Sequence, residues 1–310
     1  MRSRPSLLPA LTALFSLSLA LSACAPSQTP LLQPPVRSVR PAQTPALNLA
    51  GPRPDVILLT VSGRCGPPCR APRDNHDTLG ARGTTDALAA AFTSQGLSVQ
   101  VAAYASQLPA STQSPAIREP QRGFLALLAD VQRIQATWPG PDRPRLVLFS
   151  HSQGGPWIHY LPRVTPQVTY DLMIDLDAAC LFFQTDFSAA VSASAATLNT
   201  LLAGQPGVPS ACQYQATPKG PRLSKDIVPD NVTLNLEVHS KYHFASPGPG
   251  GGLPLNYLAD RTPNLRPDGT RRGLHLYVSR EDDHSAISQP RSQTMTWVTM
   301  NAGRIAATWK

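Results

Sequence analysis

Charged side chains are scarce in this chain. Asp, Glu, Lys and Arg make up 15% of its 310 residues and aromatic residues 6%, whereas hydrophobic residues reach 42%. This composition excludes a globally disordered chain and allows a sizeable core. No block of lysines and arginines occurs, so the charge runs typical of a nucleic-acid patch are absent. The net charge of +8 falls to +6 without Arg2 and Arg4 of the leader, and we expect no nucleic-acid partner.

Cysteine is also rare. Apart from Cys24 there are four, which allow three pairings, and an even number is typical of an oxidising compartment. Cys65-Gly-Pro-Pro-Cys69 has the spacing of half a zinc site, but no matching second half follows, so we expect no metal. We predict the disulfides Cys65–Cys69 and Cys180–Cys212, because each closes one local loop.

The leader contains no apolar run suited to spanning a membrane. The stretch from Leu7 to Leu21 is short and rich in serine, and it follows a cationic start. Leu21-Ser22-Ala23-Cys24 comes next and resembles the lipobox of bacterial lipoprotein signal peptides. The resemblance implies removal of residues 1–23, acylation of Cys24 and a lipid anchor in the cell envelope.

Ala25 stands where an aspartate tends to retain such lipoproteins at the inner membrane, which favours the outer membrane, on its periplasmic or its surface face. A plain secretory signal and an unprocessed anchor are the alternatives. Eight of the thirty residues from Ala25 to Pro54 are proline, so residues 24–54 are predicted to be a lipidated, semi-extended tether.

The remainder, residues 55–310, alternates between strand and helix patterns. Short apolar runs predict buried strands at 55–61, 97–105, 145–150, 168–177, 231–238 and 273–278. Helices are predicted at 84–95, 123–138, from Gly155 onward, and at 292–308. This alternation predicts an α/β fold with a mostly parallel central sheet flanked by helices. Two segments interrupt it, at about 178–230 and 239–272, and we interpret them as insertions within one domain.

A small polar motif follows the strand at 145–150. Ser150-His151-Ser152-Gln153-Gly154 lies between this strand and a helix, and it resembles the G-x-S-x-G nucleophile elbow of the α/β-hydrolase superfamily. Ser150 replaces the first glycine, but it is small enough for the turn. The resemblance covers the chain from Asp55 onward and implies an α/β-hydrolase fold with Ser152 as nucleophile.

A serine nucleophile needs a base and an acid that orients the base. In the superfamily the base follows the last strand, which implies His284, in Asp-His-Ser-Ala-Ile. For the acid, the run Leu176-Asp177-Ala178-Ala179 resembles that of lipases of the pancreatic type, with an alanine in place of their proline. Most members place the acid after the next strand, where Glu237 is the second choice.

The same resemblance implies an oxyanion hole made of two backbone N–H groups. One belongs to Gln153 and the other to Gly63 or Arg64, in the loop after the first strand, which the Cys65–Cys69 disulfide would hold rigid.

Apolar side chains directly follow the proposed acid. Leu181, Phe182 and Phe183 are predicted to line the substrate site as an acyl or alkyl wall, or to belong to a lid tied by Cys180–Cys212. An ordinary core beneath a long loop is the alternative.

The favoured hypothesis is a membrane-tethered serine hydrolase that acts on carboxylic esters, among them lipid esters, without metal or cofactor. Its partners are then the ester substrate and, through the lipid anchor, a membrane. A catalytically silent lipoprotein that binds a ligand or an envelope partner is one alternative, and an amidase or peptidase on the same fold is another. The sequence does not indicate an oligomeric state.

Overall fold

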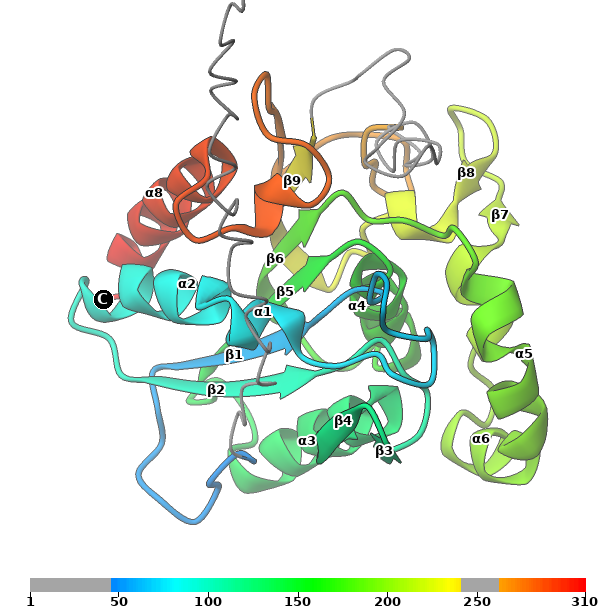
Figure 1. The fold of residues 1–310 in the computed structure, drawn as a ribbon. Helices are drawn as coiled ribbons and strands as arrows, with labels where there is room; N and C mark the ends of the chain where they lie inside the picture. Colours follow the sequence, from blue (N-terminus) through cyan, green and yellow to red (C-terminus); the bar gives the residue numbers. More distant parts are fainter. Residues whose placement is uncertain (1–45, 241–261) are drawn as a thin grey trace, which may run out of the picture. The chain divides into compact units, whose positions relative to one another are not determined.

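A computed structural model describes residues 46–240 and 262–310. Its centre is a six-stranded sheet in the order β10–β9–β6–β5–β1–β2, in which every neighbouring pair is parallel (Figure 1). The strands are β1 (Val56–Val61), β2 (Val99–Tyr104), β5 (Arg145–His151), β6 (Tyr170–Leu176), β9 (Val232–His239) and β10 (Leu274–Val278). Helices flank this sheet, so the predicted α/β class is confirmed, and the architecture fits the α/β-hydrolase fold.

Both faces of the sheet are covered, which explains why its strands are continuous apolar runs. Side chains alternate along each strand, so Val56 and Leu58 enter one hydrophobic cluster while Ile57 and Leu59 enter the other. Helices α2 (Thr84–Thr93) and α8 (Gln293–Ala307) complete the first cluster. Helices α3 (Phe124–Thr137) and α4 (Gly154–Val164) complete the second, on the opposite face (Figure 1).

Strand register brings three loops to the same level at the carboxyl edge of the sheet. Val61 of β1 pairs with Ser150 of β5, and Ser150 pairs with Asp175 of β6. The residues two positions further along are Gly63, Ser152 and Asp177, which therefore follow three adjacent strands side by side. The chain runs from β1 outward to β2 and then returns to β5 on the other side of β1. Such a reversal of strand order is where open α/β sheets place their sites.

Some described elements were not predicted. The hairpin β3 (Ser111–Ser114) and β4 (Ile117–Arg122) and the short helix α1 (Thr78–Ala81) lie between predicted elements. The first insertion is largely ordered, and it consists of α5 (Phe183–Ala193), α6 (Ala195–Leu201), the 3-10 helices η1 (Val208–Cys212) and η2 (Ser224–Asp226), and the short strands β7 (Tyr214–Gln215) and β8 (Arg222–Leu223). A 3-10 turn, η3 (Ala286–Ser288), precedes α8.

The folded body begins earlier than the predicted boundary at Asp55. Leu47 is buried in the core, and the Asn48 backbone oxygen accepts a hydrogen bond from Gln100. The predicted signal peptide at 1–23, acylated Cys24 and the tether before residue 46 lie outside the described residues, as do residues 241–261 of the second insertion. Within the described ranges, none of the helices combines the length and apolar character that a membrane crossing requires.

Candidate active site

Ser152 occupies a strained turn between β5 and α4. Its φ of 57° lies in the left-handed region, which non-glycine residues rarely adopt outside special turns. Close packing surrounds it, because a Cβ atom at Gly154 would lie 2.2 Å from the Val61 oxygen. The Ser152 N–H donates to Leu176 and its carbonyl accepts from Ala179, so the end of β6 holds the turn. The geometry is that of a nucleophile elbow, with the hydroxyl at the carboxyl edge of the sheet.

Ser152, His284 and Asp177 form one hydrogen-bonded chain. His284 Nε2 lies 2.9 Å from Ser152 Oγ, and His284 Nδ1 lies 2.9 Å from Asp177 Oδ2. Because a carboxylate only accepts, the proton is assigned to Nδ1, which leaves Nε2 free to accept from the serine hydroxyl. The three groups come from positions up to 132 residues apart in sequence.

Both oxygens of the Asp177 carboxylate take part in hydrogen bonds, which keep it in place against His284. Asp177 also has a left-handed backbone, with φ 46°, and its Oδ1 accepts from the Ser240 N–H at 2.8 Å. Burial raises the pKa of Asp177, but hydrogen bonds from His284 and Ser240 and the charge of His284 outweigh burial and lower it to about 2. Asp177 is therefore ionised at neutral pH. It is 3% exposed, against 7% for His284 and 9% for Ser152.

The second-choice acid, Glu237, lies in a different network. Its Oε1 accepts from His239 Nε2 at 2.8 Å, and both its oxygens accept from the Asn264 N–H at 3.0 Å. Asp175 likewise accepts from Asn235 and Asn264. The structure thus brings Asp177, and not Glu237, to His284.

His151, next to the serine, supports the loop that carries His284. His151 Nε2 lies 2.7 Å from the His284 carbonyl oxygen, so this nitrogen carries a proton and donates it. Burial, followed by the neighbouring His284, lowers the pKa of His151 to about 3. A neutral His151 therefore fixes the backbone of His284. The sequence had given His151 no role.

The two predicted oxyanion loops lie against each other. A Cβ atom at Gly63 would be 2.7 Å from both the His151 oxygen and Ser152 Cβ, so no side chain fits between them. The backbone N–H groups of Gly63, Arg64 and Gln153 have no acceptor within the described part of the chain. These are the donors that the predicted oxyanion hole requires.

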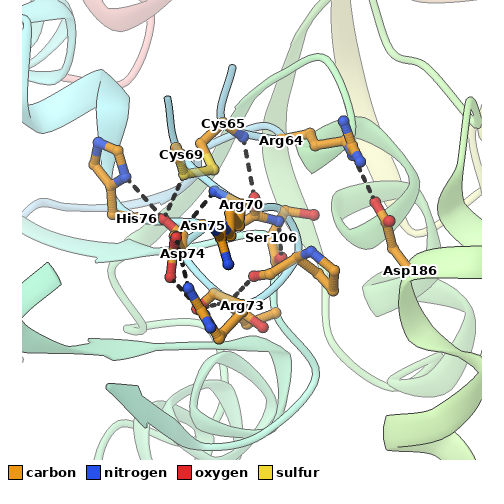
Figure 2. Close-up of a disulfide and its surroundings, with 12 residues drawn as sticks. Arg64, Cys65, Cys69, Arg70, Arg73, Asp74, Asn75, His76, Ser106 and Asp186 are labelled. Carbon is orange, nitrogen blue, oxygen red and sulfur yellow. Dashed lines mark hydrogen bonds and ion pairs between the residues drawn. A yellow bond between two sulfur atoms is a disulfide. The ribbon is translucent and has the colours of Figure 1, made fainter. Parts of the chain in front are cut away.

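The loop after β1 is held by a disulfide and by side-chain hydrogen bonds (Figure 2). The Cys65–Cys69 disulfide is present, and the Cys65 N–H donates to Asn75 Oδ1 at 3.0 Å. Asn75 in turn donates to the Ser106 carbonyl. The second disulfide, Cys180–Cys212, is also present, so both pairs are those that the sequence predicted.

The predicted apolar wall divides into two parts. Phe182 is 48% exposed, and the Arg64 guanidinium lies 4.7 Å from its ring centre, while Leu181 is half-buried. Phe183 is 1% exposed and packs with Phe187 against Trp157, so its assignment to the wall is corrected. Here the alternative of an ordinary core is the right one.

Asp186 is the residue that the sequence analysis missed. It is the only acidic residue between Asp177 and Asp226, which was the available signal. Its carboxylate accepts from Arg64 and Gln153, which belong to the two predicted oxyanion loops. No group of three or more His, Cys, Asp or Glu side chains within residues 46–240 and 262–310 could hold a metal ion.

No protein-family model and no curated protein matches this sequence. Among solved structures, Est1E from Butyrivibrio proteoclasticus with bound ferulic acid is similar at 11% identity over 84% of this chain and 91% of that one, with a TM-score of 0.38. The Pyrococcus furiosus esterase Pf2001 is similar at 9% identity over 83% and 82%, with a TM-score of 0.39.

Proposed function

We propose that this protein is a serine hydrolase that cleaves carboxylic esters through an acyl-enzyme. The observation that carries the proposal is the continuous hydrogen-bonded chain from Ser152 through His284 to Asp177. Serine alone is a poor nucleophile, and this arrangement supplies the base and the ion that orients it.

The geometry supports the following sequence of steps. Ser152 Oγ attacks the ester carbonyl while its proton passes to His284 Nε2, and the carbonyl oxygen gains the negative charge. His284 then gives that proton to the leaving alcohol as the C–O bond breaks. Water repeats the two steps on the acyl-enzyme, which releases the acid and restores Ser152. Asp177 remains ionised and stabilises the imidazolium throughout.

The developing oxyanion is stabilised by backbone N–H groups. Gln153 supplies one from the start of α4, and Gly63 or Arg64 supplies the other. Such donors act because they are already in place before charge develops, and each is typically worth about 3 kcal/mol of barrier.

The substrate carries an apolar acyl or alkyl group. Exposed Phe182 and half-buried Leu181 follow Asp177 closely in the chain and present apolar surface near the site. This favours medium-chain or lipid esters over small polar ones.

A direct test uses p-nitrophenyl butyrate and a fluorophosphonate probe. Wild-type protein should turn over the ester and carry one adduct, located on Ser152 by peptide mass spectrometry. Ser152→Ala should lose both, whereas Ser94→Ala, at the exposed serine directly after α2, should keep both. Folded wild-type protein without adduct or turnover would exclude the enzyme and favour a silent binding protein. A higher kcat/KM on the matched anilide would favour an amidase.

We also propose that the chain is exported and anchored through acylated Cys24, on the strength of Leu21-Ser22-Ala23-Cys24 and of two disulfides in the folded body. Intact-mass analysis of protein from the membrane fraction should find an acylated N-terminus at Cys24, and Cys24→Ala should release the protein from that fraction. Membrane association that survives the substitution would remove the anchor.

A further inference from the structure

One carboxylate oxygen joins the loop after β1 to the turn that carries Ser152. Oδ2 of Asp186 accepts from Arg64 Nε at 2.9 Å and from Gln153 Nε2 at 2.8 Å. Figure 2 shows Arg64 extending from the disulfide loop toward Asp186. Arg64 lies in the loop after β1 and Gln153 directly after Ser152, and in the proposed hydrolase the oxyanion N–H groups come from Gln153 and from Gly63 or Arg64. Asp186 thus connects both halves of the hole.

We propose that Asp186 is a positioning residue for the oxyanion hole, an inference that rests on the proposed hydrolase function. It does not touch the reacting atoms. It acts through the side chains of Arg64 and Gln153, and it fixes the separation and orientation of the two backbone segments to which they belong.

Both polar atoms of the Gln153 side-chain amide are hydrogen-bonded. Its Oε1 accepts from Ser106 Oγ at 3.1 Å while its Nε2 donates to Asp186. Ser106 Oγ also accepts from Trp157 Nε1 at 3.0 Å. Because both amide atoms are hydrogen-bonded, Gln153 transmits the position of Asp186 to its own backbone N–H.

Asp186 is itself fixed to the rest of the domain. It lies in the first turn of α5, between Phe183 and Phe187, whose rings pack against Trp157 of α4. The Cys180–Cys212 disulfide ties the chain just before α5 to η1. The Asp186 side chain is 6% exposed, so its bonds act with little competition from water.

Loss of this connection should reduce catalysis without reducing binding. Deleting one oxyanion donor typically costs about 10²- to 10³-fold in kcat. Loosening two donors that remain present should cost less, about tenfold. Because the ground-state substrate does not yet carry the charge, KM should change by less than about twofold.

The experiment compares Asp186→Asn with a matched control, Asp171→Asn. Asp171 is buried to a similar degree, with a side chain 7% exposed, and accepts from Arg143 and Arg145. It is the second residue of β6, at the amino end of the strand and therefore at the opposite edge of the sheet from Ser152. We expect the control to lower Tm but to keep kcat, whereas Asp186→Asn lowers kcat about tenfold on p-nitrophenyl butyrate.

A second readout separates positioning from a structural role. An alkyl trifluoromethyl ketone adds to a serine Oγ, with the proton passing to the histidine, and leaves an oxyanion in the hole. Its inhibition constant should rise in Asp186→Asn by the same factor as kcat falls. Arg64→Met, which removes one of the two contacts, should lose less activity and should be non-additive with Asp186→Asn.

The outcomes distinguish this inference from the proposed function. Wild-type protein without esterase activity would refute the function itself. Active wild type with kcat and inhibitor affinity unchanged in a folded Asp186→Asn variant would overturn the positioning role alone. If Asp186→Asn fails to fold, Arg64→Met decides the question, since unchanged kcat and inhibitor affinity in that variant would also overturn it.

Discussion

His151 lies beside the proposed nucleophile, where burial decides its protonation state. An imidazole that is removed from water and faces a second histidine takes up a proton with difficulty, which lowers its pKa from 6.5 to about 3. In the unfolded chain the same group returns to its ordinary pKa. Acid therefore favours the unfolded state through this residue.

The sign of this effect leads to a prediction. The stability that a neutral His151 provides is fully present above pH 6.5 and is lost as pH falls toward 3, by about 1.4 kcal/mol per pH unit. His151→Gln keeps a donor for the His284 carbonyl but cannot titrate. Between pH 7 and 5, the free energy of unfolding should therefore fall by about 2 kcal/mol less in the variant than in wild type, as measured with urea. An equal fall in both proteins would contradict a neutral, buried His151.

The second prediction at the residue scale concerns which carboxylate orients His284. Asp177→Asn removes the charge that holds the Nδ1 proton and stabilises the imidazolium, so kcat should fall about 10³- to 10⁴-fold. Glu237→Gln is the matched control, because Glu237 is equally buried but accepts from His239 and Asn264 instead. It should lower Tm while kcat stays within about fivefold. The reverse order of the two kcat values would transfer the role to Glu237.

The elbow and the loop after β1 depend on close contact between two elements. A methyl group at position 63 would approach backbone and Cβ atoms to 2.7 Å, and these cannot move aside as a flexible side chain would. We expect Gly63→Ala to displace Ser152 or the loop after β1 and to lower kcat about 100-fold. Gly66→Ala serves as control, since nothing lies within 4 Å of a Cβ atom there. Equal kcat in the two variants would show that the loops are not packed as described.

The sequence predicted those elements whose pattern is continuous. The six buried strands and helices α2, α3, α4 and α8 have long apolar faces or runs, so their positions agree to within a few residues. The elbow could be predicted because its sharp turn requires small residues two positions before and after the serine. Asp177 was preferred to Glu237 because its context resembles that of lipases of the pancreatic type, and the structure places it after β6, the strand next to β5.

Other elements depend on contacts that no local pattern records. The β3–β4 hairpin is largely polar and short, so it has no alternating apolar face. Phe182 and Phe183 are adjacent and identical, yet the left-handed backbone at Phe182 leaves its ring exposed while Phe183 enters the core. The contacts of His151 and Asp186 join residues 133 and 122 positions apart, respectively, which one sequence cannot reveal.

At the scale of the whole molecule, two disulfides close loops of very different length. Cys65 and Cys69 are 4 positions apart and Cys180 and Cys212 are 32 apart. A crosslink stabilises chiefly by restricting the unfolded chain, and this restriction grows with the logarithm of loop length. The longer loop contains α5, α6 and η1, so its disulfide restricts the conformations of the first insertion when the chain unfolds.

The last prediction compares the two crosslinks. Replacing both cysteines of Cys180–Cys212 with alanine should lower the free energy of unfolding by about 4 kcal/mol, against about 2 kcal/mol for Cys65–Cys69, from loop entropy alone. Urea unfolding of the two double variants and the wild type measures both values, and Cys24→Ala in every protein prevents wrong pairing. Equal losses, or a larger loss at Cys65–Cys69, would contradict the entropic account. Such a result would mean that contacts of the loop after β1, such as Cys65 with Asn75, depend on the shorter crosslink and stabilise the folded state.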